Sequence, residues 1–526
     1  MLVGTQVSTD LSLDTIQNCI PVTTSWGAQE FRKKFDTCIS DPKEIKRQQM
    51  PLLALYTEKK ICASIQSELK TIKPDIVDDI IHTNDSRISE MVGQVLWKPG
   101  SFGSFLNSSP LVLNALLTWK TLILPGFAIL MPLIAIVVPF FLLKWFNKGI
   151  EVNQYLEHMK SVILNQISIP QILKSRHADD KLGFVFESLF VGLTLAMFIS
   201  SLWNQITASM HLRNIWSDIA DRGSELQTLR QSALRVLNLL KSAPIKKQRI
   251  LHDLLEEGES ALAECKHLEG LDAVSTFGTV WNGATGIQKV KAWIAHIDVL
   301  TTIAQLDGIC FPRCAETLEL QGVYHPAVKS CVSNNLSCTN PHTLLTGPNR
   351  GGKSTFCKAV GLAVLTAQSW GFAWAKRMTW KPFRGILTAL EPCGKLGVAS
   401  TFEAEIEFAK GVLATEERPL FVMMDEIFHS TNAGDGVEAS KVFMNRLYSL
   451  PGVISVISTH YKELATTFSE AQKLQLVAHT GAEGRLTYTY TVAPGISEKS
   501  SVREILVERG LVTAVPQNKM YGKTQL

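Results

Sequence analysis

Apolar and polar positions follow two different patterns along most of this chain. From about Leu11 to Trp97, and again from about Asn204 to Leu306, apolar residues recur at helical spacing among charged ones, which predicts amphipathic helices used for core packing or helix pairing. Beyond about Gly322, continuous apolar runs end in polar or charged residues. Such runs are typical of buried parallel strands, so the carboxyl-terminal part predicts an α/β domain.

A third pattern separates the two helical stretches. Thr121 to Leu143 contains no charged residue, and at about 1.5 Å per residue a helix of this length crosses a hydrocarbon layer. Aromatic and basic residues flank it at both ends, as suits two membrane interfaces. Three prolines and the lack of a polar face are hard to reconcile with a buried helix of a soluble protein, so the segment predicts membrane insertion.

A second apolar segment, Gly183 to Trp203, is interrupted by Glu187. If it also spans, the two segments form a hairpin that keeps both halves of the chain on one side of the membrane. The loop between them is basic, with residues such as Lys160 and Arg176, and basic loops usually face the cytosol. A re-entrant or interfacial hairpin would place the loop and both halves in the cytosol. The sequence does not choose between these arrangements.

Composition and charge exclude few classes of protein. The chain has 526 residues, of which 46% are hydrophobic and 19% charged, which allows several domains. A net charge of +4 neither demands nor excludes nucleic acid. The ten cysteines lack regular pairing and favour a reducing compartment, and the mostly polar stretch Met1 to Asp10 predicts no secretory signal.

Four cysteines and one histidine crowd into a short stretch. They are Cys310, Cys314, His325, Cys331 and Cys338. Zinc sites usually contain paired C-x-x-C knuckles, which this spacing lacks. Buried or free thiols are therefore the favoured interpretation, and zinc ligation is the alternative.

A glycine-rich turn follows the apolar run that ends at Thr346. It carries the pattern G-x-x-x-x-G-K-S, and an apolar helix is predicted from Phe356 to Trp370. Glycines let backbone N–H groups approach phosphate oxygens, and the helix points its positive dipole end at the same anion. The lysine of such a turn reaches the β- and γ-phosphates, and the serine hydroxyl suits Mg²⁺. The predicted nucleotide-binding residues are Gly347, Pro348, Asn349, Arg350, Gly351, Gly352, Lys353, Ser354 and Thr355.

Two carboxylates at the end of a later apolar run disfavour the alternative of a chance glycine turn. Asp425 would hold Mg²⁺ together with Ser354, and Glu426 would polarise an attacking water. His460 follows the next apolar run, and polar residues at the carboxyl ends of parallel strands face the ligand crevice. We therefore expect ATP and Mg²⁺ as cofactors, with Glu426 as a catalytic residue. His460 alone would more often be a satisfied structural histidine, and it is a further candidate catalytic residue.

Four pieces in this order resemble the ATPase domain of the MutS family, a branch of the ABC-type ATPases. They are Thr346–Thr355, Ser400–Glu405, Met424–Ile427 and Ser458–Leu464. The second piece resembles the family's signature segment, whose serine reaches the γ-phosphate bound by the opposing subunit. The resemblance therefore implies that Ser400 is catalytic in trans and that the chain forms a homodimer through its ATPase domain.

The resemblance is strong from about Gly322 to Leu511 and weaker in the helical core on either side of the hydrophobic insert. Gly322–Pro326 is similar to the family's Arg-His-Pro segment near the nucleotide, with Tyr324 in place of arginine. After the glutamate that corresponds to Glu426, the family usually has Gly-Arg-Gly-Thr. This chain has Phe428-His429-Ser430-Thr431 in that place. That departure puts the coupling between ATP sites and the rate of turnover in question.

The resemblance also shapes the expected function. No room is left for the family's mismatch-reading domain before Leu11, and the apolar hairpin occupies the place of its DNA clamp. We expect a membrane-associated member lacking the mismatch-recognition domain, with its ATPase domain facing the cytosol, that hydrolyses ATP as a dimer and transmits the nucleotide state through lever helices. The alternative is a membrane-tethered member that binds DNA in mismatch repair or recombination, but DNA enters only through the resemblance.

The expected fold class is multidomain. A helical core and lever region, interrupted by a hydrophobic membrane segment, precedes a carboxyl-terminal α/β P-loop (ABC-type) ATPase domain. The predicted boundaries are 1–110 for a helical MutS-core-like segment, 111–203 for a transmembrane hairpin or re-entrant region, 204–310 for a helical lever segment, 311–515 for the ATPase domain and 516–526 for a polar tail.

Overall fold

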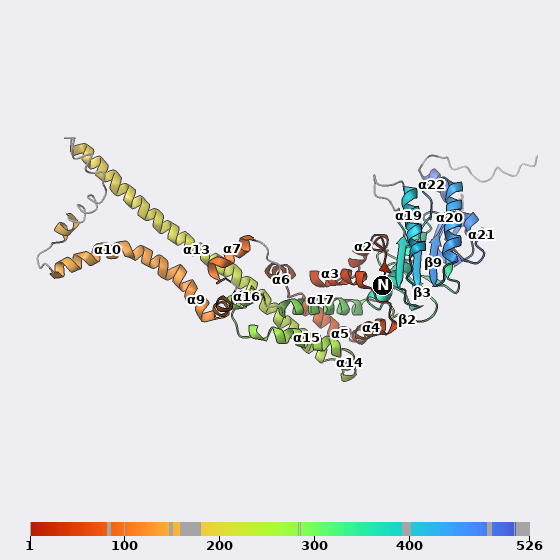
Figure 1. The fold of residues 1–526 in the computed structure, drawn as a ribbon, viewed down its shortest axis with the longest axis horizontal. Coiled ribbons are helices and arrows are strands. Elements are labelled where there is room, and N and C mark those ends of the chain that lie inside the picture. Colours follow the sequence, from red (N-terminus) through yellow and green to blue (C-terminus); the bar gives the residue numbers. More distant parts are fainter. Residues whose placement is uncertain are drawn as a thin grey trace, which may run out of the picture. The chain divides into compact units, whose positions relative to one another are not determined.

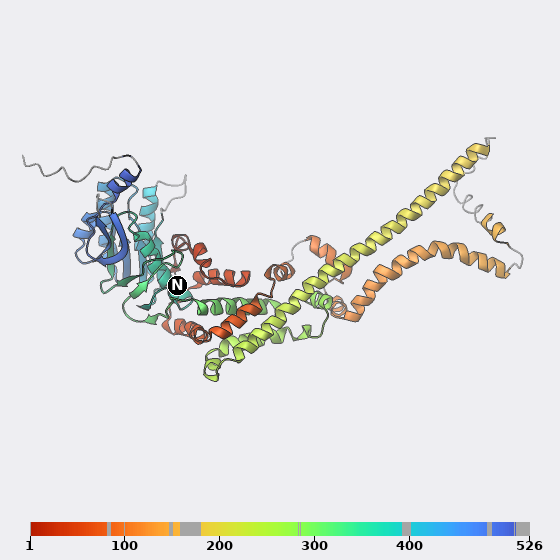
Figure 2. The ribbon, with the colours of Figure 1, turned by 180° about the vertical axis from the view of Figure 1, so that it is seen from behind.

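The computed structural model describes residues 2–81, 86–98, 100–146, 151–157, 180–281, 283, 286–391, 401–480, 486–509 and 511. Figures 1 and 2 show their helices and strands from opposite sides. The chain forms two compact units: the first unit comprises Met1–Ile72, Ser232–Ala261 and Lys289–Leu526, and the second unit comprises Lys73–Gln231 and Leu262–Gln288. Each unit therefore gathers segments that are distant in the sequence.

A seven-stranded sheet forms the centre of the first unit. In order across the sheet, its strands are β1 (Leu2–Val3), β7 (Gly385–Ala389), β8 (Leu420–Met424), β9 (Val453–Ser458), β5 (His342–Thr346), β10 (Gln472–Thr480) and β11 (Leu486–Pro494). All neighbours are parallel except β10 and β11. Every residue of β5, β7 and β8 is buried. The continuous apolar runs of the sequence arise because helices cover both faces of these strands.

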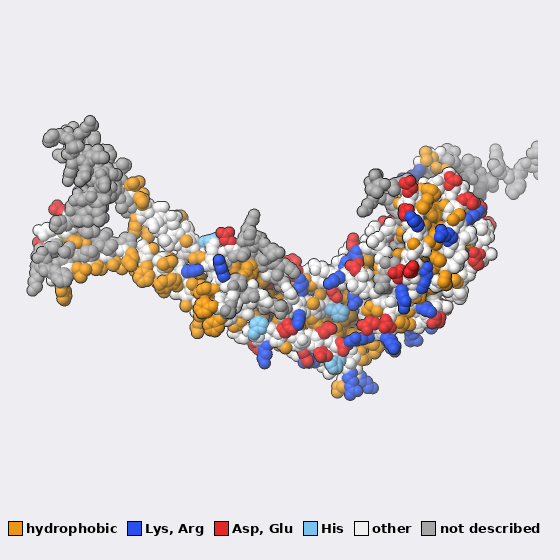
Figure 3. All heavy atoms as spheres, viewed as in Figure 1, with side chains coloured by type: hydrophobic (Ala, Val, Ile, Leu, Met, Phe, Trp, Pro, Cys, Tyr) orange, Lys and Arg blue, Asp and Glu red, His pale blue; other side chains and the backbone are white. Residues whose placement is uncertain are grey.

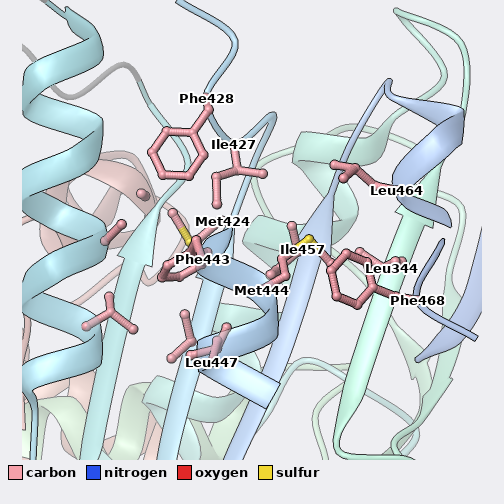
Figure 4. Close-up of a cluster of buried hydrophobic side chains, with 14 of the residues drawn as sticks. Leu344, Met424, Ile427, Phe428, Phe443, Met444, Leu447, Ile457, Leu464 and Phe468 are labelled. Atoms are coloured by element: carbon pink, nitrogen blue, oxygen red, sulfur yellow. The ribbon is translucent and has the colours of Figure 1, made fainter. Parts of the chain in front are cut away.

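The two faces of the sheet carry different helices. Met424 contributes to a buried cluster with side chains of α19 (Thr401–Ala414), α20 (Ala433–Tyr448) and α21 (Lys462–Thr467), drawn in Figure 4. The preceding residue, Met423, points to the opposite face, where its Cε atom would lie 3.2 Å from a Cβ atom on Gly361 of α18 (Lys353–Ser369). The predicted carboxyl-terminal α/β domain is confirmed.

A second, four-stranded sheet belongs to the same unit. Its order is β2 (Arg313–Cys314), β6 (Arg377–Trp380), β3 (Glu319–Val323) and β4 (Asn334–Ser337). The last helix of this unit, among the residues that the structure describes, is the short α22 (Val502–Glu508).

The amino-terminal segment joins the large sheet, which the sequence did not predict. β1 pairs with β7, and the amide of Gly4 continues the ladder by donating to the Ile386 carbonyl over 2.9 Å. After α1 (Val7–Asp10), the buried Asp10 carboxylate accepts from the Thr388 hydroxyl at 2.6 Å and from the Glu391 amide at 3.1 Å. Burial raises the pKa of Asp10 above its usual value. A two-residue strand is too short to produce a recognisable alternation.

Helices from the amino-terminal part and from the middle of the sequence complete the first unit. They are α2 (Leu13–Gln17), α3 (Ser25–Lys33), α4 (Pro42–Tyr56), α5 (Lys59–Leu69), α14 (Ile245–Ile250), α15 (His252–Glu264) and α17 (Gly286–Gln305). The fully buried Asp298 of α17 accepts from the Thr24 amide and hydroxyl, each at 2.7 Å. A Cβ atom on Gly27 would lie 2.5 Å from the same carboxylate. Only glycine therefore fits where α3 crosses α17.

The described part of the second unit is helical. Its elements are α6 (Pro74–Ile81), α7 (Ser86–Val95), α8 (Ser101–Asn107), α9 (Pro110–Thr118), the π turn η2 (Trp119–Ile123), α10 (Leu124–Phe146), most of α13 (Asp180–Lys241) and α16 (Ala273–Trp281). The helical character predicted on both sides of the hydrophobic insert is confirmed. The apolar segment Gly183 to Trp203 and the first part of the amphipathic stretch, as far as Lys241, form one uninterrupted helix of 62 residues, α13.

The apolar helices of the second unit expose much of their surface. Pro110–Met131 is the one helical span, among the residues that the structure describes, with the length and hydropathy to cross a membrane, and 11% of its most apolar window is buried. It overlaps the first half of the predicted segment Thr121 to Leu143. Hydrophobic side chains gather on the surface of α9 and α10 (Figure 3), and Leu111 and Trp145 are more than four-fifths exposed. Membrane insertion stays a prediction.

Candidate functional site

The glycine-rich turn lies between β5 and α18, at the carboxyl edge of the large sheet. Gly352 has φ = +97°, in the left-handed region that favours glycine, and a Cβ atom on Gly351 would lie 2.9 Å from the Pro348 carbonyl oxygen. Arg350 also has a positive φ, of +67°, and its guanidinium pairs with Glu508 of α22. The turn therefore closes tightly enough to exclude side chains at two of its glycines.

A cavity of about 720 Å³ opens at this turn. Among the predicted site residues, it is lined by Pro348, Asn349, Arg350, Gly352, Lys353, Ser354, Thr355, Asp425 and Glu426. Gly347 and Gly351 belong to the turn without lining the cavity, and His460 is exposed to solvent beside Tyr461, with ring centroids 4.1 Å apart. Ser400 lies outside the described residues. The structure thus brings most of the predicted residues together.

Lys353 and Glu426 form an ion pair in the wall of this cavity. The lysine side chain is 5% exposed, and its Nζ atom donates to the Gly347 carbonyl over 3.2 Å and lies 3.5 Å from Glu426 Oε1. A buried ammonium needs a counter-charge, which the glutamate provides. An anion entering the turn would compete with this carboxylate for Lys353.

Asp425 is fixed by the neighbouring strands. Its backbone amide donates to the Ala389 carbonyl over 2.8 Å, and its carboxylate accepts a hydrogen bond from the Ser458 hydroxyl of β9. The Ser354 hydroxyl is exposed at the start of α18. A carboxylate and a hydroxyl are oxygen donors of the kind that Mg²⁺ prefers. The glycine-rich cradle, the buried cation and these oxygen donors together fit a magnesium–polyphosphate ligand.

The chain leaves β8 through a strained turn. Glu426 has φ = +50° and Phe428 has φ = +54°, and left-handed residues other than glycine cost about 1 kcal/mol or more each. The Glu426 amide donates to the Ser458 carbonyl over 3.1 Å, which ties this turn to β9. Strain of this kind persists only where the surroundings hold it.

Several residues around the cavity were not among the predicted site residues. Tyr490 of β11 has φ = +56°, and its ring would lie 3.2 Å from a Cβ atom on Gly352. Its carbonyl accepts from the Asn334 side-chain amide over 2.9 Å. Glu405 and His429 line the same cavity. No local signal in the sequence marks Tyr490, because its left-handed backbone and its approach to the turn depend on how β11 pairs with β10.

The fold and this site define a multidomain protein in which helical segments accompany a carboxyl-terminal α/β domain, with a glycine-rich turn at the carboxyl edge of a mostly parallel sheet. Residues 343–517 match the family model described as MutS domain V. This match confirms, for the carboxyl-terminal part of the chain, the resemblance to the MutS family found in its sequence motifs.

Curated relatives match the carboxyl-terminal half. "DNA mismatch repair protein MutS" of Thermus thermophilus is 31% identical over 235 residues, which cover 43% of this chain and 29% of that protein. The proteins of the same name from Shouchella clausii and Thermotoga neapolitana are 29% and 31% identical, over 41% and 44% of this chain and 26% and 30% of their own lengths. The matched region thus spans less than a third of these relatives.

Proposed function

We propose that the chain is a membrane-anchored MutS-like ATPase that binds and hydrolyses ATP as a homodimer and transmits the nucleotide state through its helices. The observation that carries this proposal is the meeting of Lys353, Ser354, Asp425 and Glu426 around one cavity beside a glycine cradle. Phosphoryl transfer to water needs an anion cradle, a metal site and a residue that orients the water.

Each of these residues has a separate role in the proposed reaction. The backbone N–H groups of the turn bind phosphate oxygens, and Lys353 supplies a cation at the same place. Phosphate binding draws Lys353 away from Glu426, whose carboxylate is then free to orient the attacking water. Ser354 and Asp425 would hold Mg²⁺, which neutralises phosphate charge when bound. Ser458 keeps the Asp425 carboxylate in place through its hydrogen bond.

The proposed homodimer rests on the family resemblance. Ser400 would complete the ATP site of the partner subunit, and His460 would approach the γ-phosphate from the end of β9. Asp435–Gly436, at the start of α20, resembles the family's D-loop. A Cβ atom on Gly436 would lie 2.5 Å from the Phe428 carbonyl oxygen and 2.6 Å from the Tyr461 hydroxyl. The packing therefore restricts this position to glycine.

The proposed membrane anchor leads to a direct prediction. Deleting Thr121 to Leu143 is expected to move the protein from membranes to the soluble fraction, because the deletion removes the uncharged helical surface. A gentler variant, Phe127→Asp with Leu130→Asp, should weaken sedimentation with membranes, since each carboxylate costs about 3 kcal/mol in a bilayer centre. Both side chains are about half exposed, with 47% and 51% of their surfaces accessible.

Carbonate-washed membranes provide the measurement. Val442→Asp is the matched control, because Val442 is 61% exposed on α20 of the first unit and should leave fractionation unchanged. Protease protection of the two termini would then test whether the ATPase domain faces the cytosol. Sedimentation of the deletion variant with washed membranes would contradict the anchor.

The alternative function is a membrane-tethered family member that binds DNA in mismatch repair or recombination. Its support is the name of the relatives, which are mismatch repair proteins. Detergent-purified protein would be titrated with matched, mismatched and branched duplexes at about 50 and 200 mM salt, where phosphate-contacting proteins lose roughly a thousandfold or more in affinity. Salt-dependent binding that prefers one structure would favour this alternative. No binding to any duplex is the result we expect.

A further inference from the structure

The turn that carries Glu426 is held from two sides by contacts to the body of the domain. On one side, the Glu426 amide donates to the Ser458 carbonyl over 3.1 Å. On the other side, the Phe428 ring is 2% exposed and lies in the buried cluster with Met424 and Phe443 (Figure 4). The Tyr461 hydroxyl also donates to the Phe428 carbonyl over 3.4 Å. These contacts fix the ends of the turn but leave the Glu426 carbonyl to another partner.

That partner is the His429 ring. Its Nδ1 atom lies 2.8 Å from the Glu426 carbonyl oxygen, so a proton on Nδ1 is donated to this carbonyl. The same nitrogen lies 3.3 Å from Oε1 of Glu405, on α19. The ring therefore lies between a helix and the backbone of the residue expected to orient water.

Glu405 is suited to hold this ring. Its carboxylate is largely buried, with 11% of the side chain exposed, and burial raises its pKa, while hydrogen bonding from Ser430 and the nearby His429 lower it. Phe402, one turn earlier on α19, contacts Phe428 with ring centroids 6.0 Å apart. Two side chains of α19 thus contact two consecutive residues of the segment after β8.

We propose that Glu405 and His429 form a positioning pair that fixes the backbone at Glu426, so that a shift of α19 changes where the Glu426 carboxylate points. Glu405 holds the imidazole, the imidazole holds the Glu426 carbonyl, and the left-handed backbone at Glu426 directs its carboxylate towards Lys353. This inference rests on the proposed ATP hydrolysis. It assigns His429 no contact with the nucleotide.

The test compares full-length, detergent-purified variants. His429→Ala removes the donor to the Glu426 carbonyl, so kcat should fall about tenfold to a hundredfold, the loss expected when a reacting group shifts by up to 1 Å. The KM for ATP and the Kd for a non-hydrolysable ATP analogue should change less than about twofold, because nucleotide contacts remain. His429→Asn should recover most of the rate, since its amide can donate from nearly the same position as Nδ1.

Hydrogen exchange adds a readout that does not depend on activity. Backbone amides around 424–430 should exchange faster without nucleotide in His429→Ala than in the wild type, and His429→Asn should restore the slower rate.

A double variant tests whether the two residues act together. Combining Glu405→Ala with His429→Ala should lower kcat no more than His429→Ala alone, because the two residues act in series. Lys410→Ala, at an exposed position of α19 that pairs with Glu407, is the control and should change none of these quantities.

The possible failures are distinguishable. A His429→Ala variant with wild-type kcat and exchange overturns the positioning pair while leaving ATP hydrolysis intact. Loss of analogue binding in parallel with kcat also overturns it, because His429 would then contact the nucleotide. A wild-type protein that neither binds nor hydrolyses ATP overturns the proposed function and this inference together.

Discussion

Replacing Lys353 by alanine is expected to abolish ATP hydrolysis and to weaken nucleotide binding by roughly a hundredfold. Charge-assisted hydrogen bonds to phosphate contribute about 3 kcal/mol, and Lys353 is the cation inside the glycine cradle. Lys353→Met should behave alike, because it keeps most of the side-chain volume but not the charge. Turnover would be followed by phosphate release, and binding by displacement of a fluorescent ATP analogue.

Lys381→Ala is a suitable control for this substitution. Lys381 is about half exposed and pairs with the exposed Glu316 on the surface of the same unit. Its removal should leave binding and turnover unchanged. Wild-type turnover in Lys353→Ala, with an unchanged melting temperature, would refute the assignment of the turn as a phosphate site.

Glu426→Gln is expected to separate binding from hydrolysis. The amide cannot polarise water as the carboxylate does, and loss of a general base typically slows a reaction by about 100- to 10,000-fold. The phosphate turn and Asp425 remain, so ATP should stay bound and hold two chains together. Elution from a sizing column as a stable ATP-dependent dimer, with ATP retained in the peak, is the predicted result.

The matched control for this change is Glu407→Gln. Glu407 is 70% exposed on α19 and pairs with Lys410, far less buried than Glu426. It should hydrolyse ATP at the wild-type rate and show no trapped dimer. If Glu426→Gln elutes as a monomer in ATP and magnesium, the paired-site mechanism is wrong.

The large sheet was predictable wherever burial on both faces left a clear pattern. β5 and β8 are continuous apolar runs because α18 covers one face and α19 to α21 the other. β1 escaped prediction because two residues form no pattern, and its place at the sheet edge depends on pairing with β7, which is distant in the sequence. Similarly, α13 runs through the point where its composition changes, because helix geometry does not require a constant polar face.

In the candidate site, too, some residues were predictable from the sequence and others were not. Turn and strand-end residues such as Lys353 and Asp425 were predicted because their chemistry is local to one motif. The contact between Glu405 and His429 depends on how α19 packs beside β8, and neither residue carries a spacing that reveals the other. The need for glycine at position 27 was likewise not predictable, because it depends on the Asp298 side chain of α17, which is distant in the sequence. Ser400 stays a prediction from the family resemblance.

The most direct test of the account is sedimentation velocity of the purified wild-type chain, recorded with and without a non-hydrolysable ATP analogue and Mg²⁺ while nucleotide absorbance is followed. If ATP is held between two copies of the ATPase domain, the analogue cosediments with the protein in a magnesium-dependent manner and the protein mass in the complex doubles. A protein that sediments identically in both conditions, with no nucleotide in the boundary, would contradict it.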